Sequence, residues 1–152
     1  MRLGIEVVAG QDVLKALTAA GGKSLSAIKL GIRKCAMLVE RKAKETVYDG
    51  HPEHLEGDKG GLRRSITVQY VQSGLTAHIG PNVVYAAIHE FGGTIVPKTA
   101  NYLRFKTKDG AWHTVSKVTI PARPYMRPAL AEEQPRFGGI MANTLLEGIG
   151  LS

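Results

Sequence analysis

The chain has 152 residues, 43% of them hydrophobic and 22% charged, which is the size and composition of one globular domain spanning 1–152. Its single cysteine, Cys35, excludes an intrachain disulfide and a four-cysteine zinc site, and no apolar run approaches the roughly 20 residues that cross a bilayer. The formal net charge of +7 favours an anionic partner, such as nucleic acid or an acidic protein surface. The N-terminal residues lack the long apolar region of a secretory signal, so we expect a cytoplasmic chain that contacts no membrane.

The N-terminal part of the chain predicts a strand followed by helices. Residues 2–9 alternate as a half-buried strand does, and residues 10–22 predict a short helix that stops at two glycines. The clearest helix covers 24–47, where small and apolar residues recur at steps of three and four and Ser24 is a suitable N-cap. Cys35 lies on this apolar stripe, so we interpret it as structural. A charge-rich helical face is usually just solvated, but here its cations are also candidates to line a channel or meet DNA: Lys29, Arg33, Lys34, Arg41, Lys42 and Lys44.

The middle of the chain predicts a loop, a hairpin and a short helix. Residues 48–61 are polar and interrupted by Gly and Pro, which is typical of a mobile loop. The runs Ser65–Val71 and Leu75–Gly80 predict a β-hairpin. Residues 83–91 predict a short helix that Gly92 or Gly93 ends. The apolar stripe expected for that helix comprises Val84, Ala87, Ile88 and Phe91.

The C-terminal part predicts a second hairpin and a last helix. The hairpin covers 101–121, and the three prolines within 121–128 exclude regular structure there. A helix is expected from Pro128 to about Leu146, interrupted at Pro135 and at the glycine pair that follows it. The element order predicts an α+β fold in which a mostly antiparallel sheet of about four to five strands packs against the long N-terminal helix and the C-terminal helix.

No stretch of the sequence assembles a convincing active site. His51 and His54 have a spacing that suits a metal, but Pro52 disfavours a helix there and a loop offers no rigid frame. His89 and Glu90 are sequence neighbours, so on a helix their side chains point about 100° apart and make a poor acid–base pair. We therefore expect no enzyme, no cofactor and no resident metal. A metal-dependent enzyme that uses the histidines, His113 included, stays an alternative that metal content would test.

Three short stretches carry a resemblance: GGLRRSI at 60–66, YAAIHEFGG at 85–93 and IPARPYMRPAL at 120–130. In this order they resemble the tail-completion and head–tail joining proteins of tailed double-stranded DNA bacteriophages, the phage virion morphogenesis or minor tail component family. The resemblance covers roughly residues 20–148. The residues that match its motifs are Leu62, Arg63, Ser65, Ile66, Tyr85, Ala86, Glu90, Phe91, Gly92 and Ala122 through Ala129, which include Arg123, Pro124, Tyr125, Arg127 and Pro128.

Physical chemistry gives these matched residues structural roles. Tyr85 and Phe91 are large apolar side chains that we expect to anchor the short helix on the sheet. Gly92 and Gly93 allow the chain to turn where a Cβ atom would clash. The proline-rich segment is expected to fix the direction of the last helix.

Glu90 is expected to reach a fixed arginine, and Arg123 and Arg127 are the candidates. A bidentate pair between the guanidinium and the carboxylate would lock the two motif segments together. In this hypothesis the stretch around Glu90 is a corner and a clamp, and His89 takes no part in chemistry.

The resemblance implies a structural phage or prophage protein that completes the tail or joins head to tail during virion morphogenesis. It would lie in the virion, at the neck or tail end, and in the bacterial host cytoplasm during assembly. Implied partners are a tail terminator, a connector or adaptor, the tail tube and further copies of the chain in a ring around the DNA passage, formed from a subunit that is either monomeric or oligomeric beforehand. We expect the 48–61 loop and a protruding 94–117 hairpin to contact these neighbours. The alternative is a sequence-independent nucleic-acid-binding protein, and whether the cations meet DNA or an acidic protein stays open.

Overall fold

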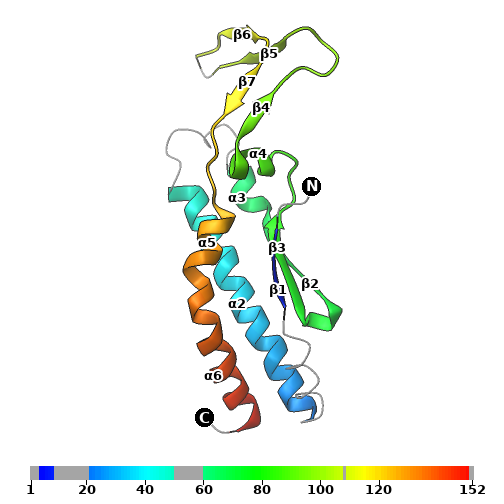
Figure 1. Cartoon of the computed structure of the whole chain (residues 1–152), viewed down its shortest axis with the longest axis vertical. Helices are drawn as coiled ribbons and strands as arrows, with labels where there is room; N and C mark the ends of the chain where they lie inside the picture. Colours follow the sequence, from blue (N-terminus) through cyan, green and yellow to red (C-terminus); the bar gives the residue numbers. More distant parts are fainter. Residues whose placement is uncertain (1–3, 9–20, 50–59, 108, 151–152) are drawn as a thin grey trace.

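The computed structural model describes residues 4–8, 21–49, 60–107 and 109–150. A three-stranded antiparallel sheet and a long helical hairpin form an elongated body, and two narrow β-ribbons extend from one end of it (Figure 1). The predicted mixture of helix and strand, with a long N-terminal helix and a C-terminal helical segment, is confirmed.

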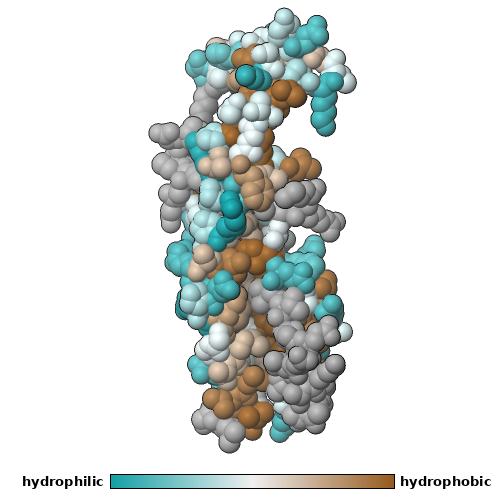
Figure 2. All heavy atoms as spheres, in the orientation of Figure 1, coloured by the Kyte–Doolittle hydropathy of each residue, from teal (hydrophilic) through white to brown (hydrophobic). Residues whose placement is uncertain are grey.

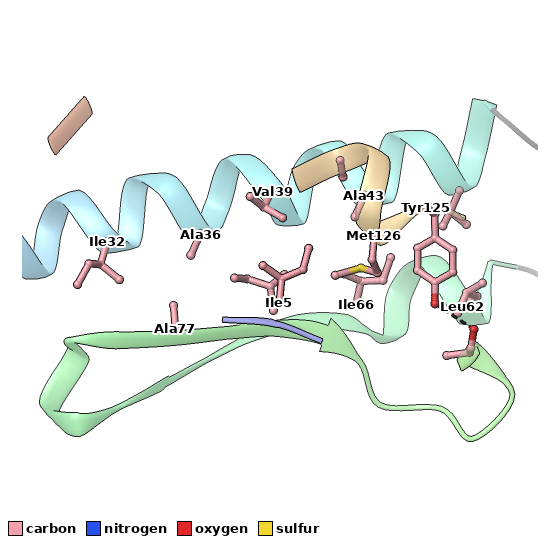
Figure 3. Close-up of a cluster of buried hydrophobic side chains, with 14 of the residues drawn as sticks. Ile5, Ile32, Ala36, Val39, Ala43, Leu62, Ile66, Ala77, Tyr125 and Met126 are labelled. Carbon is pink, nitrogen blue, oxygen red and sulfur yellow. Dashed lines mark hydrogen bonds between the residues drawn. The ribbon is translucent and has the colours of Figure 1, made fainter. Parts of the chain in front are cut away.

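Helix α2 (Gly22–Asp49) organises the body, and it confirms the helix predicted over 24–47. Its buried residues recur at steps of three and four: Ala27, Ile28, Ile32, Cys35, Ala36, Val39, Ala43 and Val47. This stripe packs on the sheet, and α2 also contacts the C-terminal helices (Figure 3). Ser24, the predicted N-cap, lies instead within the first turn, where its N–H donates to the carbonyl oxygen of Gly21 at 3.2 Å.

The sheet has the order β1 (Ile5–Val8), β3 (Thr76–Pro81) and β2 (Ile66–Val71), with every pair antiparallel. The predicted first strand and the predicted first hairpin are therefore confirmed for the described residues, with η2 (Gln72–Gly74) as the hairpin turn. A short helix that the sequence did not predict, α3 (Gly61–Ser65), leads into β2.

Helix α4 (Ala86–Phe91) confirms the predicted short helix, but its inward face is not the predicted one. The buried residues are Ala86 and Glu90, whereas Val84 is 98% exposed and Phe91 is 44% exposed. Glu90 therefore lies on the buried face of α4, where apolar side chains were expected, because its carboxylate has hydrogen-bond donors there.

The strands after α4 form two separate ribbons. β4 (Gly93–Ile95) pairs with β7 (Val118–Ile120), and β5 (Leu103–Lys106) pairs with β6 (Trp112–Val115), both antiparallel. Within the described residues these strands do not join the three-stranded sheet, so the expected single sheet of four to five strands is wrong. The physical reason is that neither ribbon has a buried side chain, which joining a packed sheet would require.

The C-terminal helical segment runs antiparallel to α2 and consists of α5 (Met126–Glu133), η3 (Gln134–Arg136) and α6 (Phe137–Ile149) (Figure 1). Pro135 interrupts the helix as predicted, but the following glycine pair lies inside α6. The helix also begins earlier than expected, at Met126, with Pro128 in its first turn. N–H groups in the first turn have no acceptor within the helix, so a proline there costs no hydrogen bond.

Two predicted segments fall mainly outside the described residues. Of the helix predicted over 10–22, only Gly21 and Gly22 are described, and Gly22 begins α2. Of the loop predicted over 48–61, only the ends are described, and α2 continues to Asp49.

Candidate assembly site

The three matched stretches converge at the end of the core nearest the ribbons. Leu62 and Ile66 come from α3 and β2, Ala86 from α4, and Tyr125 and Met126 from the start of α5, and all are at most 2% exposed. Figure 3 shows Tyr125 and Met126 between α2 and the sheet, with Tyr125 beside Leu62. The Tyr125 hydroxyl donates to the carbonyl oxygen of Ala86 at 3.4 Å. The motifs are therefore parts of one packed unit.

Glu90 lies at the centre of this unit and is fully buried, although its side chain is ionisable. Its Oε2 accepts hydrogen bonds from the backbone N–H groups of Tyr125 at 2.7 Å and Met126 at 3.0 Å, and its Oε1 accepts one from the N–H of Arg127 at 3.2 Å. These N–H groups open α5 and have no acceptor within the helix, and Tyr125 supplies no side-chain cap. A carboxylate there is also favoured by the helix dipole. The carboxylate of Glu90, which comes from a different helix, thus caps the N-terminus of α5 in place of a side chain at the N-cap position.

The arginines contribute less than the sequence predicted. Nε of Arg127 lies 3.5 Å from Oε1 of Glu90, but the Arg127 side chain is 69% exposed, and its guanidinium carbon lies 5.5 Å from the centre of the Phe91 ring. Arg123 acts through its backbone, since its N–H donates to the carbonyl oxygen of His89 at 2.7 Å. Exposed ion pairs contribute little to stability. The prediction that Glu90 reaches Arg127 is therefore confirmed, but the bidentate geometry is wrong, because one nitrogen of Arg127 makes the contact and backbone N–H groups hold the carboxylate.

Gly92 makes the turn that follows Glu90. Its φ is 70°, and a Cβ atom there would lie 2.6 Å from the backbone nitrogen of Ala122 and 3.0 Å from the carbonyl oxygen of Ile120. Any side chain would therefore collide with the backbone that leads into α5. Gly93 packs against Ile88, where a Cβ would meet Cγ1 at 3.3 Å. We refer to Glu90, Gly92 and the backbone of 122–127 as the clamp.

The other matched residues line the clamp or lie at its surface. Burial raises the pKa of the Tyr125 phenol, and the negative charge of Glu90 adds to this, so the hydroxyl stays a donor. The buried Ser65 hydroxyl donates to the carbonyl oxygen of Leu62 at 2.7 Å. Tyr85 packs partly buried against the core, with its ring edge to face with that of His89. The remaining matched residues, Arg63, Pro124 and Pro128, are exposed.

The two ribbons form an arm, residues 93–120, that leaves the body at the clamp (Figure 1). None of its residues whose burial is described is buried. Tyr102 is 62% exposed, Phe105 40% and Trp112 59%. Figure 2 shows hydrophobic and hydrophilic residues mixed over this end of the molecule. The arm therefore exposes three large aromatic side chains, with Phe105 and Trp112 on opposite faces of the β5–β6 ribbon.

The cations predicted to line a DNA passage are mostly engaged with other side chains of the chain itself. The ion pairs join Lys34 to Glu147, Arg41 to Glu45, Lys42 to Glu132 and Lys44 to Glu40. The hydrogen bond that the Lys42 ammonium donates to Glu132 raises the pKa of Lys42. The guanidinium of Arg33 lies over the ring of Tyr70. Less positive charge is therefore free on α2 than the sequence indicates, and the role of Lys29 and its neighbours toward DNA stays a prediction.

Sequence reasoning missed two structural features of the candidate site. The capping role of Glu90 had a signal, because α5 opens without Ser, Thr, Asp or Asn at its N-cap and so needs an acceptor from elsewhere. The exposed aromatics of the arm also had a signal. Tyr102 and Trp112 lie in a hairpin that also carries Arg104, Lys106 and Lys108, so at least one of its faces is expected to be solvated.

The described residues hold no group of three or more His, Cys, Asp or Glu that could bind a metal ion. Of the histidines weighed as ligands, His51 and His54 lie outside the described ranges, and His113 stacks on Phe105 in the arm. Cys35 is buried in the α2 stripe, and burial raises the pKa of its thiol. In the part of the chain that is described, no helix is long and apolar enough to cross a membrane.

Comparison with known proteins gives one match. A model of the phage virion morphogenesis family matches residues 36–145, from the middle of α2 to α6. The match therefore includes the clamp and the whole arm. No curated protein and no solved structure matches the chain.

Proposed function

Because the chain belongs to the phage virion morphogenesis family, whose members are phage structural and assembly proteins, we propose that it completes the tail or joins head to tail during virion assembly. It acts at the neck or tail end of the particle, as a structural subunit and not as an enzyme. Its partners are other neck and tail proteins, such as a tail terminator, a connector or adaptor, and the tail tube.

The observation that carries this proposal is the arm and the way it is held. None of its residues whose burial is described has a buried side chain, yet the clamp fixes both ends of the arm to the core. A segment that adds nothing to the core but is anchored this firmly is suited to contacting another molecule. Loops and protrusions on a rigid support are where proteins usually carry such contacts.

We further propose that copies of the chain form a closed ring around the DNA passage. In the described sheet, β1 and β2 are both edge strands, and unpaired strand edges are available for contacts between subunits. The net charge of +7 suits a position beside DNA that passes through the ring without sequence-specific contacts.

The test is deletion of the gene from the phage or prophage that encodes the chain, followed by complementation. We expect electron micrographs of induced cultures without the chain to show filled heads and separate tails. Wild-type protein from a plasmid should restore joined, infectious particles. Joined particles in unchanged number without the chain would refute the proposal.

Solution measurements separate the alternative function. Light scattering across concentration, with and without a short duplex DNA at physiological salt, gives the mass of the free protein. A discrete closed oligomer, or a monomer that ignores DNA, is the result expected for an assembly subunit. Strong, steeply salt-dependent DNA binding by the monomer would instead support a sequence-independent nucleic-acid-binding protein.

A further inference from the structure

The outer ribbon of the arm, β5 with β6, has two chemically different faces. Side chains of paired residues lie on the same face of a ribbon, and the register pairs Leu103 with Val115 and Arg104 with Thr114. The apolar face comprises Leu103, Phe105, His113 and Val115. The cationic face comprises Arg104, Lys106, Trp112 and Thr114.

Neither face is covered by the part of the chain that is described. Leu103 and Val115 are only partly buried, and the other six residues of the two faces are exposed. A two-stranded ribbon alone in water is marginally stable and normally needs a layer packed on it. Both faces of the outer ribbon therefore lack a packing layer, and another molecule could supply it on each side.

The charge of the arm identifies one property of that partner. In the sequence, residues 93–120 carry five Lys or Arg and one carboxylate, so they hold +4 of the net charge of +7. The single carboxylate, Asp109, accepts hydrogen bonds from the Thr107 hydroxyl and the Ala111 N–H. The cations of the arm therefore have no free carboxylate within the arm itself, and an acidic partner complements them.

Arg104 and Trp112 show how the cationic face would be used. The guanidinium carbon of Arg104 lies 4.7 Å from the centre of the Trp112 ring, so the flat group rests on an aromatic face. A guanidinium stacked in this way keeps the N–H donors along its edge for a carboxylate in its plane. Trp and Arg are also the residues most enriched among the dominant contacts of protein interfaces.

The described part of a second copy offers the cationic face no carboxylate that lacks a contact. Every carboxylate whose side chain is described already has a partner in its own chain. Besides Glu90 and Asp109, these pair as Glu6 with His78, Glu40 with Lys44, Glu45 with Arg41, Glu132 with Lys42, Glu133 with Arg136 and Glu147 with Lys34. DNA fits the cationic face but offers nothing suited to the apolar face opposite it.

We propose that the outer ribbon inserts into a cleft of a different protein of the particle, one with an apolar wall and a wall that carries carboxylates. Phe105 packs on the apolar wall, and Arg104 and Lys106 pair with the carboxylates beside Trp112. This inference rests on the proposed assembly function, because it takes the partner to be another virion protein.

The test is site-specific photo-crosslinking in assembled particles. A photoreactive phenylalanine replaces Tyr102, which is exposed at the start of the outer ribbon, and in a control it replaces Val84 on the body. After illumination, mass spectrometry should identify one different polypeptide joined to position 102, through a segment rich in Asp and Glu, and not to position 84. Crosslinks from position 102 to a second copy or to DNA, or none in particles that contain the protein, would each overturn the proposal.

Charge reversal then tests the chemistry of the contact. The double variant Arg104→Glu with Lys106→Glu should lower the yield of this crosslink about tenfold, which corresponds to losing one dominant contact. Changing the crosslinked acidic residues of the partner to Lys should restore the yield. Lys23→Glu, which reverses one charge at the opposite end of the molecule, is the control and should leave the yield unchanged (Figure 1). An unchanged yield in the double variant would show that the cationic face is not used.

Two failures remain distinguishable. If deletion of the gene blocks joining but position 102 gives no crosslink to another protein, the assembly function stands and the ribbon contact is wrong. If deletion leaves joining intact, the assembly function itself is wrong. Because no described residue of the arm is buried, the double variant should keep the melting temperature of the wild-type body, which thermal unfolding checks.

Discussion

Removal of the Glu90 carboxylate should destabilise the protein far more than removal of its arginine partner. In Glu90→Ala, the N–H groups of Tyr125 and Met126 lose their acceptor in a place that water does not reach. A buried donor left without an acceptor costs about 1–3 kcal/mol, and the third bond, from Arg127, is longer and partly exposed. The expected loss is therefore about 3–5 kcal/mol of the free energy of unfolding. That is a large fraction of the ~5–15 kcal/mol typical of a domain.

Two milder variants make the reasoning measurable even if Glu90→Ala does not fold. In Glu90→Gln, the amide oxygen can still accept from Tyr125 and Met126, but the charge is lost and the NH2 group faces the N–H of Arg127. We expect a loss of about 1–2 kcal/mol. Arg127→Ala removes an ion pair and a contact with the Phe91 ring, both made by a largely exposed guanidinium, so its cost should stay at about 1 kcal/mol or less.

Urea unfolding followed by circular dichroism at equilibrium gives these free energies, provided that the slope with urea concentration is unchanged between variants. The expected order of loss is Glu90→Ala, then Glu90→Gln, then Arg127→Ala. If Arg127→Ala costs as much as Glu90→Gln, the ion pair holds the clamp and the capping account is wrong. A Glu90→Ala variant within about 0.5 kcal/mol of wild type would also refute it.

Two further predictions concern the turn of the clamp and the tip of the arm. Gly92→Ala should lower the free energy of unfolding by at least about 2 kcal/mol, because it adds a Cβ against the backbone of Ala122 at positive φ. Gly138→Ala in α6, which has open space around it, should raise the free energy of unfolding by about 0.5–1 kcal/mol. Urea unfolding of both variants checks these two values. At the tip, hydrogen bonds from Thr107 and Ala111 hold the pKa of Asp109 below its ordinary value of 3.8. The stabilisation of this turn is therefore present above that pH and lost as pH falls through the lowered pKa, so the NMR amide shift of Ala111 should titrate there, and Asp109→Asn should abolish the titration.

The elements that the sequence predicted correctly are those that local periodicity determines. The α2 stripe repeats at three and four residues over its whole length, and the β2–β3 and β5–β6 hairpins alternate around short turns that each contain one glycine. In the hairpins each residue pairs with a residue close in the sequence, and in α2 the buried residues all lie on one face of the helix. Pro135 likewise interrupted the last helix through its own missing N–H.

The wrong predictions concern relations between distant segments. Nothing local to 93–120 shows that its strands leave the sheet, because alternation predicts a strand but not its neighbour. The inward face of α4 was assigned by hydrophobicity, which placed Val84 and Phe91 inside. The decisive factor was the N–H groups that open a helix 35 residues away, which the carboxylate of Glu90 satisfies.

The position of the clamp separates two questions about the protein. The residues that carry the family resemblance cap α5, make the turn at Gly92 and fill the core beneath, so they explain how an arm is held in one direction. None of them lies in the outer ribbon, because Arg104, Phe105 and Trp112 belong to none of the three stretches, although the family match spans this ribbon. The three stretches therefore account for the support and not for the partner. The identity of the partner has to follow from the chemistry of the two faces, and a cationic face opposite an apolar one requires a protein surface that complements both.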